Sequence, residues 1–345
     1  MYERSSRMKK DTTFSYVSDE KKILKYLTLG INIPISQEYH KYIIHDLRFF
    51  RAQSIVLKYK SHSLGHVLVY DEHEHNPSTL YFGYFGVDQH QTDFIILLLE
   101  ELVSYGKTHH YKKIKGPINI PTVIYGWGFM EEGSLEDLYA GRPVNPPIYQ
   151  HIFFNHGFTV VNKEVSWEGP LPVFDPFQLD GYNFQDYEVF HPQSISELME
   201  LKPIFQQLHN ENMPPGSIIT PRINELFENY VDYIIRYGGL DMFFFARHKP
   251  SNKIVACGSN LPNPFRKDHN GKQDSFVAFT VVINAEHQNK GLVILLTGVN
   301  FLQMRRRNMR YLSGPANNSH EISTHVARKL GLNDLRTHLI LELNI

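Results

Sequence analysis

The residues of this chain that are best suited to chemistry lie in a short polar loop that ends at Gly291. Residues 276–283, rich in Val and Phe, precede the loop and predict a buried strand, and an apolar run with helical spacing begins at Leu292. Glycine lets a ligand approach the backbone closely, and the first N–H groups of a helix lack partners within it. With the positive end of the helix dipole, they form an anion site suited to a phosphate or a pyrophosphate. The alternative interpretation is an ordinary strand-to-helix turn in which glycine serves packing.

The spacing of this loop resembles the Q/R-x-x-G-x-G/A motif with which acyltransferases of the GNAT superfamily hold the pyrophosphate of acetyl-coenzyme A (acetyl-CoA). Residues 283–291 also resemble the longer V-x-P-E-Y-R-G-K-G run of that family. Two positions differ. Ala285 replaces the usual proline, and Val293 replaces the final small residue and adds bulk where the diphosphate oxygens would lie. The six residues of the motif are Gln288, Asn289, Lys290, Gly291, Leu292 and Val293.

The resemblance also implies how the rest of the cofactor is held. In GNAT folds the central strand splays from its parallel neighbour, and the pantetheine arm enters the gap and bonds to the backbone of the central strand. Carried over, this assigns Val281, Val282 and Ile283 to cofactor binding through main-chain groups, while their side chains serve equally as apolar core. Asn318 is a further candidate, and it can instead cap the helix that follows, with Glu321 completing a capping-box pair.

The elements around the loop occur twice along the chain. A Gly-Pro-x-Asn motif, at Gly116 and at Gly314, holds the same place in both halves, which favours an internal duplication. The first half predicts helices over 22–29, 37–50, 92–107 and 147–156, and strands over 54–59, 65–70, 80–87, 112–116 and 159–167. The second half predicts helices over 223–237, 292–306 and 319–329, and strands over 242–247, 253–259, 276–283, 309–312 and 337–343.

This order, with the resemblance, predicts an α/β fold of two tandem GNAT-like domains, each a mixed but mostly antiparallel sheet flanked by helices. The expected parts are a loose polar leader over 1–22, a first domain over 23–168, a proline-rich linker over 169–184 and a second domain over 185–345.

The two predicted domains differ at the phosphate-binding turn. In the first domain the corresponding residues, 88–93, contain no glycine and carry Asp88 and Asp93, which would repel a diphosphate. We therefore expect the first domain to be degenerate and the second to bind acyl-CoA, similar to the unequal halves of mycothiol synthase or N-myristoyltransferase.

Acetyl transfer to an amine needs a base for the amine proton and a donor for the departing thiolate. Many GNAT relatives use a tyrosine on the closing helix, four residues before its terminal glycine, but Phe153 and Ala327 stand at those positions. His320 and His325 lie on the second closing helix and titrate near neutrality, so they are the candidate catalytic residues. Cys257 lies in a strand pattern and fits a core residue better than a nucleophile.

A long irregular segment, residues 120–146, is inserted before the closing helix of the first half. Long loops inside compact domains are usually functional or mobile. Its residues Tyr125, Trp127 and Arg142 are candidates for an acceptor pocket. The alternative is a packed cover over a sheet edge.

The acidic and histidine-rich string at residues 71–75 could be taken for a metal site, but a solvated charge run in a loop explains it better, and we expect no metal. The 345 residues suffice for two domains, and 35 basic against 36 acidic side chains predict no nucleic-acid or membrane partner held by bulk charge. A single cysteine fits a reducing compartment.

These observations predict a cytoplasmic, acyl-CoA-dependent N-acyltransferase that uses acetyl-CoA as cosubstrate. Its acceptor is expected to be a small-molecule or peptide amine, and the chain is expected to be a monomer or a homodimer. One alternative is a catalytically inactive CoA-binding or scaffolding protein with a GNAT fold, favoured by the missing tyrosine and by Val293. Another is a Fem-type aminoacyltransferase, which also has paired GNAT-like domains but takes an aminoacyl-tRNA, and the near-neutral charge argues against it.

Overall fold

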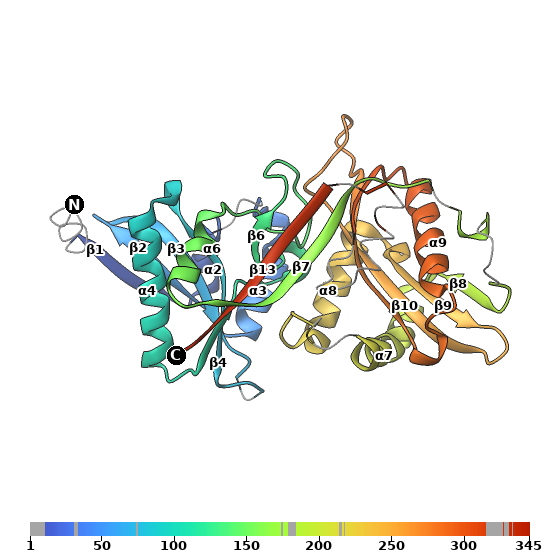
Figure 1. Ribbon diagram of the computed structural model, residues 1–345, viewed down its shortest axis with the longest axis horizontal. Coiled ribbons are helices and arrows are strands. Elements are labelled where there is room, and N and C mark those ends of the chain that lie inside the picture. The colour runs from blue at the N-terminus through green and yellow to red at the C-terminus, as the bar shows by residue number, and fades with distance from the viewer. Residues whose placement is uncertain are drawn as a thin grey trace. The chain divides into compact units, whose positions relative to one another are not determined.

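The computed structural model describes residues 11–30, 34–73, 75–173, 175–178, 184–213, 216, 218–314, 327, 331–332 and 334–345 (Figure 1). The chain forms two compact units. Unit 1 comprises Met1–Glu164, Ile219–Leu226 and Thr337–Ile345, and unit 2 comprises Val165–Ile218 and Phe227–Arg336. Among the helices described, none has the length and apolar character needed to cross a membrane.

Unit 1 contains a mixed, mostly antiparallel sheet. Its strands follow the order β1-β2-β3-β4-β5-β13, and β6 pairs with β13. The pairing of β4 with β5 is parallel and the others are antiparallel. The strands are β1 (Thr12–Val17), β2 (Gln53–Tyr59), β3 (His62–Tyr70), β4 (Thr79–Val87), β5 (Lys113–Gly116), β6 (Phe129–Glu132) and β13 (Asp334–Asn344).

Helices cover the sheet of unit 1. All nine residues of β4 are buried, so both faces of this strand are covered, and its sequence is apolar without alternation. The α-helices are α2 (Glu20–Leu27), α3 (His40–Phe49), α4 (Thr92–Thr108), α5 (Thr122–Tyr125) and α6 (Ile148–Asn155), and η1 (Gln37–Tyr39) and η2 (Asp88–His90) are single 3₁₀ turns.

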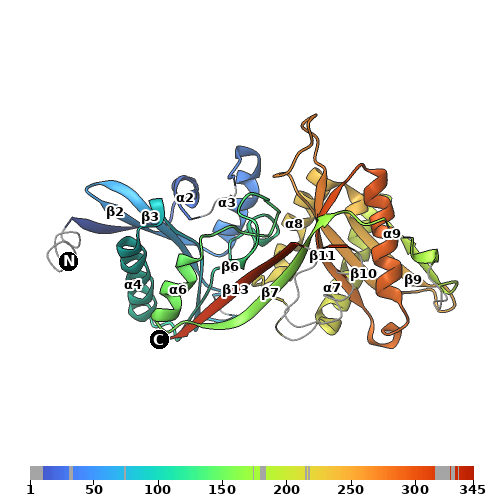
Figure 2. The same cartoon turned by 45° about the horizontal axis from the view of Figure 1, so that its top comes forward.

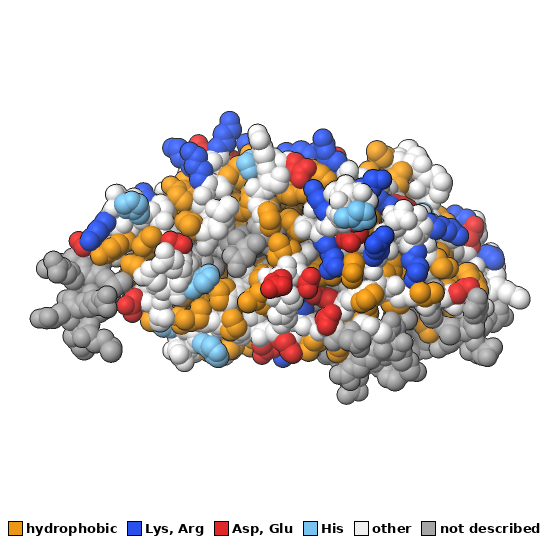
Figure 3. Space-filling view, turned by 90° about the horizontal axis from the view of Figure 1, so that it is seen from above, with side chains coloured by type: hydrophobic (Ala, Val, Ile, Leu, Met, Phe, Trp, Pro, Cys, Tyr) orange, Lys and Arg blue, Asp and Glu red, His pale blue; other side chains and the backbone are white. Residues whose placement is uncertain are grey.

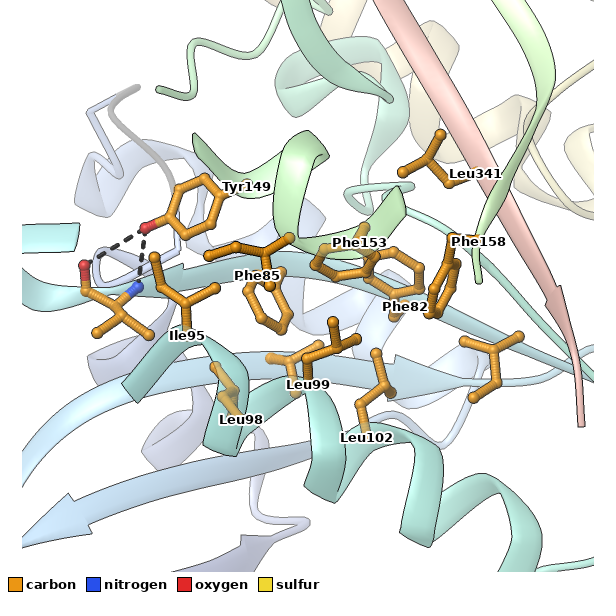
Figure 4. Packing of buried hydrophobic residues seen from close by; sticks show 14 of the residues in the cluster. Phe82, Phe85, Ile95, Leu98, Leu99, Leu102, Tyr149, Phe153, Phe158 and Leu341 are labelled. Atoms are coloured by element: carbon orange, nitrogen blue, oxygen red, sulfur yellow. Dashed lines mark hydrogen bonds between the residues drawn. The ribbon is translucent and has the colours of Figure 1, made fainter. Parts of the chain in front are cut away.

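Aromatic rings fill the core of unit 1 between α4, α6 and the sheet (Figure 4). The ring of Phe153 on α6 has its centroid 4.9 Å from those of Phe85 and Phe129, in the edge-to-face geometry that aromatic pairs prefer. α4 contributes one apolar face at helical spacing, made of Ile95, Leu98, Leu99 and Leu102.

In unit 2 the strands follow the order β7-β12-β11-β10-β9-β8. The pairing of β11 with β12 is parallel and the others are antiparallel. The strands are β7 (Thr159–Pro170), β8 (Tyr187–Phe190), β9 (Phe243–His248), β10 (Lys253–Pro262), β11 (Ser275–Ile283) and β12 (Tyr311–Ser313).

Helices pack on both faces of the β9 region in unit 2. Phe205 of α7 contacts the rings of Phe243 and Phe245, while the alternate residues Phe244 and Ala246 join the core beneath α9. The helices are α7 (Ile195–Asn212), α8 (Ile223–Gly238, whose first turn belongs to unit 1) and α9 (Leu292–Arg306), with 3₁₀ turns η3 (Pro176–Gln178), η4 (Leu240–Met242) and η5 (Ala285–His287).

The strands that close the two halves of the sequence are exchanged between the units. β13 ends the second half of the chain, yet it pairs with β5 and β6 in unit 1. β7 ends the first half, and its last residues pair with β12 in unit 2, with Glu168 opposite Ser313. The strand order of each unit therefore includes a strand from the other half of the sequence.

A buried ion pair joins the two exchanged strands within unit 2. Arg336 Nε donates to Glu168 Oε1 at 2.8 Å, and Arg336 Nη2 donates to Glu168 Oε2 at 3.1 Å. Their side chains expose 0% and 6% of their surface. A bidentate pair of this kind is strong and directional, and its desolvated charges are costly to separate.

Unit 1 also buries a carboxyl group, Glu164 on β7, beside Arg142 and Trp127. Burial raises the pKa of Glu164 to about 7, although the Arg142 charge and a hydrogen bond with Trp127 act in the opposite direction. Glu164 Oε2 has no hydrogen-bond partner among the described residues. Desolvation thus outweighs the attraction of the neighbouring cation.

The predicted helices and strands are confirmed wherever the structure describes them, with end positions that differ by a few residues. The loose leader is wrong for Thr12–Val17, because this segment forms β1 and pairs with β2, and Phe14 packs on the core. Helix α7 was not predicted, because its apolar pattern is weak and is interrupted by Pro203. The predicted helix over 319–329 lies outside the described residues except for Ala327.

Removing one partner of the Arg336–Glu168 pair should destabilise the protein. We expect Glu168→Gln to lower the free energy of unfolding by about 3 kcal/mol, because Arg336 then remains buried with its charge unpaired. The double variant Glu168→Leu/Arg336→Met should lose less than this. Urea unfolding followed by circular dichroism measures both. Equal stability of Glu168→Gln and the wild type would contradict the prediction.

The stability contributed by Glu164 should fall as the pH rises. The folded protein binds the proton of this carboxyl more tightly than the unfolded chain, so the charged form opposes folding. Between pH 4.5 and pH 7 this should cost about 3 kcal/mol. Glu164→Gln mimics the neutral form, so it should match the wild type in thermal unfolding at about pH 4.5 and exceed it at about pH 8. A less stable Glu164→Gln at the higher pH would contradict this.

Candidate functional site

The candidate site begins where β11 parts from β12. The two strands pair in parallel only at Ser275, Phe276 and Val277 of β11. From Ala278 to Ile283 the ladder of β11 continues with β10, and these two strands lie side by side in Figure 2. On the side away from β10, the outer part of β11 therefore has no strand partner in the described part of the chain.

The predicted strand, loop and helix are present at the end of β11. After Ile283 the chain makes the 3₁₀ turn η5, which Asn284 opens by accepting the Glu286 N–H on its side chain at 3.0 Å. Gln288 turns back and donates from Nε2 to the Ile283 carbonyl at 3.0 Å. Gly291 then precedes α9 with φ 75°, in the left-handed region that glycine adopts without strain.

The start of α9 presents backbone donors. Ile294 N and Leu295 N both donate to the Gly291 carbonyl, at 2.9 and 3.2 Å. The N–H groups of Leu292 and Val293 make no hydrogen bond with a described residue, and Gly291 offers no side chain to cap them. The first turn contains no acidic residue, and Lys290 is exposed just before it. The charge at this helix start is therefore positive, as an anion requires.

The two apolar residues of the motif lie in different surroundings. Leu292 is buried and belongs to the core beneath α9, with Leu295 and Leu296, so it fixes the start of the helix. Val293 exposes 45% of its surface. Gln288, Asn289 and Lys290 are exposed as well.

The other predicted cofactor residues lie on the outer part of β11. Val281, Val282 and Ile283 pair with Gly258, Cys257 and Ala256 of β10. Val281 and Ile283 pack against the core beneath α9, whereas Val282 faces the opposite side and is buried. Their main-chain role in cofactor binding stays a prediction.

Two further rings lie next to the loop, and no motif in the sequence pointed to them. The Tyr187 hydroxyl is 3.0 Å from His287 Nδ1, and the ring centroids of His248 and His287 are 4.8 Å apart. Desolvation, together with the charges of Lys290 and His248, lowers the pKa of His287. His287 is therefore neutral at neutral pH, and a bound anion would favour its protonated form.

Unit 1 contains the corresponding break between parallel strands, but other groups of unit 1 bond to the backbone of β4 beyond the break. β4 pairs with β5 only from Thr79 to Tyr81. Beyond this point Tyr84 N donates to Asn119 Oδ1 at 2.7 Å, and Val87 N donates to Tyr149 Oη at 3.0 Å (Figure 4). Asn119 belongs to the Gly-Pro-x-Asn motif, so this motif fills the gap in the first half.

The turn that follows β4 also lacks the features of the second half. Tyr149 Oη lies 2.7 Å from His90 Nδ1, and the turn η2 carries Asp88. The first turn of α4 contains Asp93, whose charge opposes an anion at that position.

The remaining candidate residues are placed as follows. Tyr125, Trp127 and Arg142 are buried within unit 1, and Arg142 and Trp127 surround Glu164. Phe153 lies in the aromatic core, and Ala327 is buried. Cys257 is buried and its pKa is raised by desolvation, so the thiol does not ionise easily. His320, His325 and Asn318 lie outside the described residues.

The acidic and histidine-rich loop contacts neighbouring side chains. Asp71 Oδ2 accepts a hydrogen bond from the Tyr111 hydroxyl at 2.5 Å, and Glu72 accepts one from Tyr81. In the described ranges no group of three or more His, Cys, Asp or Glu side chains is placed to hold a metal ion.

Comparison with known proteins gives matches at the level of structure. No family model and no curated protein matches the sequence. The tandem GNAT protein from the clavulanic acid biosynthesis pathway aligns with a TM-score of 0.59 at 13% identity, over 96% of this chain and 98% of that chain. The GCN5-related N-acetyltransferase from Sphaerobacter thermophilus aligns with a TM-score of 0.56 at 10% identity, over 96% and 95%.

A third structure matches only part of a longer protein. It is the GCN5-related glucosamine N-acetyltransferase region of a fungal multi-domain GH3 β-N-acetylglucosaminidase, with a TM-score of 0.61 at 13% identity, and the match covers 96% of this chain but 38% of that chain. At such identities the likeness concerns the fold. It confirms the predicted fold class: the chain has the GNAT fold of the tandem GNAT proteins that it resembles.

Proposed function

We propose that this protein is an acyl-CoA-dependent N-acetyltransferase whose unit 2 binds acetyl-CoA. The observation that supports the proposal best is the arrangement at the end of β11. There the strand leaves its parallel neighbour and is followed by a helix start after Gly291, where two N–H donors bond to no described residue. The fold shared with GCN5-related N-acetyltransferases supports the same class of reaction.

Each part of this arrangement has a role in the proposal. The N–H groups of Leu292 and Val293, with Lys290, would hold the diphosphate, and the outer part of β11 would hold the pantetheine arm through its backbone. In the transfer, the amine nitrogen attacks the thioester carbonyl carbon and the carbon–sulfur bond breaks. The amine loses a proton and the thiolate gains one. The acceptor in this proposal is a small-molecule or peptide amine, and the protein acts in the cytoplasm.

A catalytically inactive CoA-binding protein is the second candidate. It is favoured by the closing helices, where Phe153 is part of the aromatic core and Ala327 is buried, so neither position supplies the tyrosine hydroxyl of many relatives. Turnover separates the two candidates: release of free thiol from acetyl-CoA with a panel of amines supports the enzyme, and binding without release supports the inactive protein.

Binding of acetyl-CoA should depend on Gly291. We expect Gly291→Glu to weaken binding at least tenfold, about 1.4 kcal/mol, because the new side chain adds negative charge at the anion site. Isothermal titration calorimetry with acetyl-CoA measures the change. Gly271→Glu is a matched control, since Gly271 has the same φ of 75° in an open loop of unit 2, where a Cβ atom would meet nothing within 4 Å. No binding by the wild type, or equal loss in both variants, would contradict the proposal.

The affinity for acetyl-CoA should also rise as the pH falls through the pKa of His287. The free protein holds His287 neutral, and a bound diphosphate favours the proton, so binding should be tighter at about pH 5.5 than at about pH 7.5. His287→Gln should reduce this dependence, and any part that persists in the variant comes from other groups, such as the ligand's own phosphate. Titration at the two pH values checks it, and an unchanged pH dependence in His287→Gln would contradict the role of this residue.

A further inference from the structure

Two segments of unit 2 place basic side chains on one surface, away from the candidate site. The first is the loop between β10 and β11, with Lys267 and Lys272. The second is the end of α9 and the turn after it, with Arg305, Arg306 and Arg310. All five side chains are exposed. We call these five residues the basic surface, and Figure 3 shows Lys and Arg side chains gathered on this face of the molecule.

Backbone hydrogen bonds hold the two segments together. Arg310 N and Tyr311 N both donate to the carbonyl of Asp274, at 2.7 and 3.2 Å. The guanidinium of Arg266 lies 3.6 Å from the centroid of the Tyr311 ring, which adds a cation–π contact between the same segments. The loop is therefore fixed against the end of α9, and the basic surface is one continuous feature.

The carboxylates near the basic surface are Asp241, Asp274 and Asp268, and the Asp268 charge offsets part of the positive charge of the loop. Asp241 pairs with Arg307 at 2.8 Å, and Asp274 lies 3.6 Å from Arg266. Asp268 accepts the backbone N–H groups of Asn270 and Lys272. None of the five side chains of the basic surface forms an ion pair with a described residue.

A favourable interaction with the dipole of α9 accounts for only some of the basic residues on this surface. Arg305 and Arg306 lie in the last turn of α9, where cations interact favourably with the helix dipole. Lys267, Lys272 and Arg310 lie outside the helix and gain little from that dipole, which falls off within the last turn. Like charges held together on a surface repel one another and lower the stability of the free protein, and a bound negatively charged partner would offset this repulsion.

We propose that the basic surface binds the phosphate backbone of a single-stranded nucleic acid. Guanidinium groups match the geometry of phosphate oxygens, and the adjacent Arg266 guanidinium, which lies over the Tyr311 ring, offers its outer planar face to a nucleobase. An acidic peptide would satisfy the charges but has no base to stack. The near-neutral charge of the whole chain is compatible with this surface, because the charge is local.

The basic surface and the candidate cofactor site lie at opposite ends of α9. The helix has 15 residues and is therefore about 22 Å long. Occupation of one site should leave the other free, so the nucleic acid would act as a docking partner rather than as a competitor for acetyl-CoA.

Fluorescence anisotropy with a labelled single-stranded RNA of about 12 nucleotides tests the proposal. We expect the full-length protein to bind it, with affinity falling about tenfold or more between about 50 mM and about 200 mM salt. Arg306→Glu/Arg310→Glu and Lys267→Glu/Lys272→Glu should each weaken binding at least tenfold. Lys21→Glu/Lys25→Glu, on exposed positions of α2, makes the same change in net charge and should have little effect.

Several results would overturn the proposal. The first is that the wild type does not bind the RNA, and the second is that the α2 control loses as much RNA affinity as the surface variants. The third is that poly-glutamate competes as effectively as unlabelled RNA, which would indicate an acidic protein partner. Thermal unfolding of each variant shows whether a loss of binding reflects misfolding. Acetyl-CoA affinity unchanged in the two surface variants would support the independence of the two sites, and its loss in step with RNA binding would overturn it.

Discussion

The candidate site depends on a parallel ladder that stops early. β11 and β12 pair over three positions, and beyond them no described strand pairs with β11 on the side away from β10. An unpaired edge of this kind inside a domain is costly unless another group satisfies it. The turn after β11 adds N–H donors at a helix start whose first residue, Leu292, is fixed in the core. In the proposed function, this strand edge and this helix start together hold an extended molecule with a negatively charged part.

In unit 1, side chains bond to the strand backbone beyond the point where the parallel ladder stops. Its parallel ladder also stops after three pairs, but Asn119 and Tyr149 bond to the backbone of β4 beyond that point. The turn after β4 also carries the negative charges of Asp88 and Asp93, whereas the first turn of α9 carries no acidic residue. The two halves share the order of their elements but differ in what bonds to the strand beyond the shortened parallel ladder. The proposed function assigns binding to the second half on the basis of this difference.

The local features of this fold could be predicted from the sequence, whereas several long-range ones could not. Residues 276–296 carry a strand pattern, a glycine and a helix pattern in succession, so the site was recognisable from adjacent residues. The roles of Tyr187 and His248 were hidden because these residues are distant in sequence from His287 and are brought to it by strand pairing. β1 was missed because a strand at the edge of a sheet needs only a few apolar residues, such as Phe14. The exchange of β7 and β13 could not be predicted, because both strands suit either sheet by composition.

The exchange of closing strands has a consequence for the origin and the handling of this chain. Two identical subunits that trade their terminal strands would yield this connectivity once their genes were fused. In the fused chain, cutting between the halves would leave each fragment short of the strand that completes its own sheet, with an open edge prone to aggregation. Neither half is then expected to fold as an autonomous module.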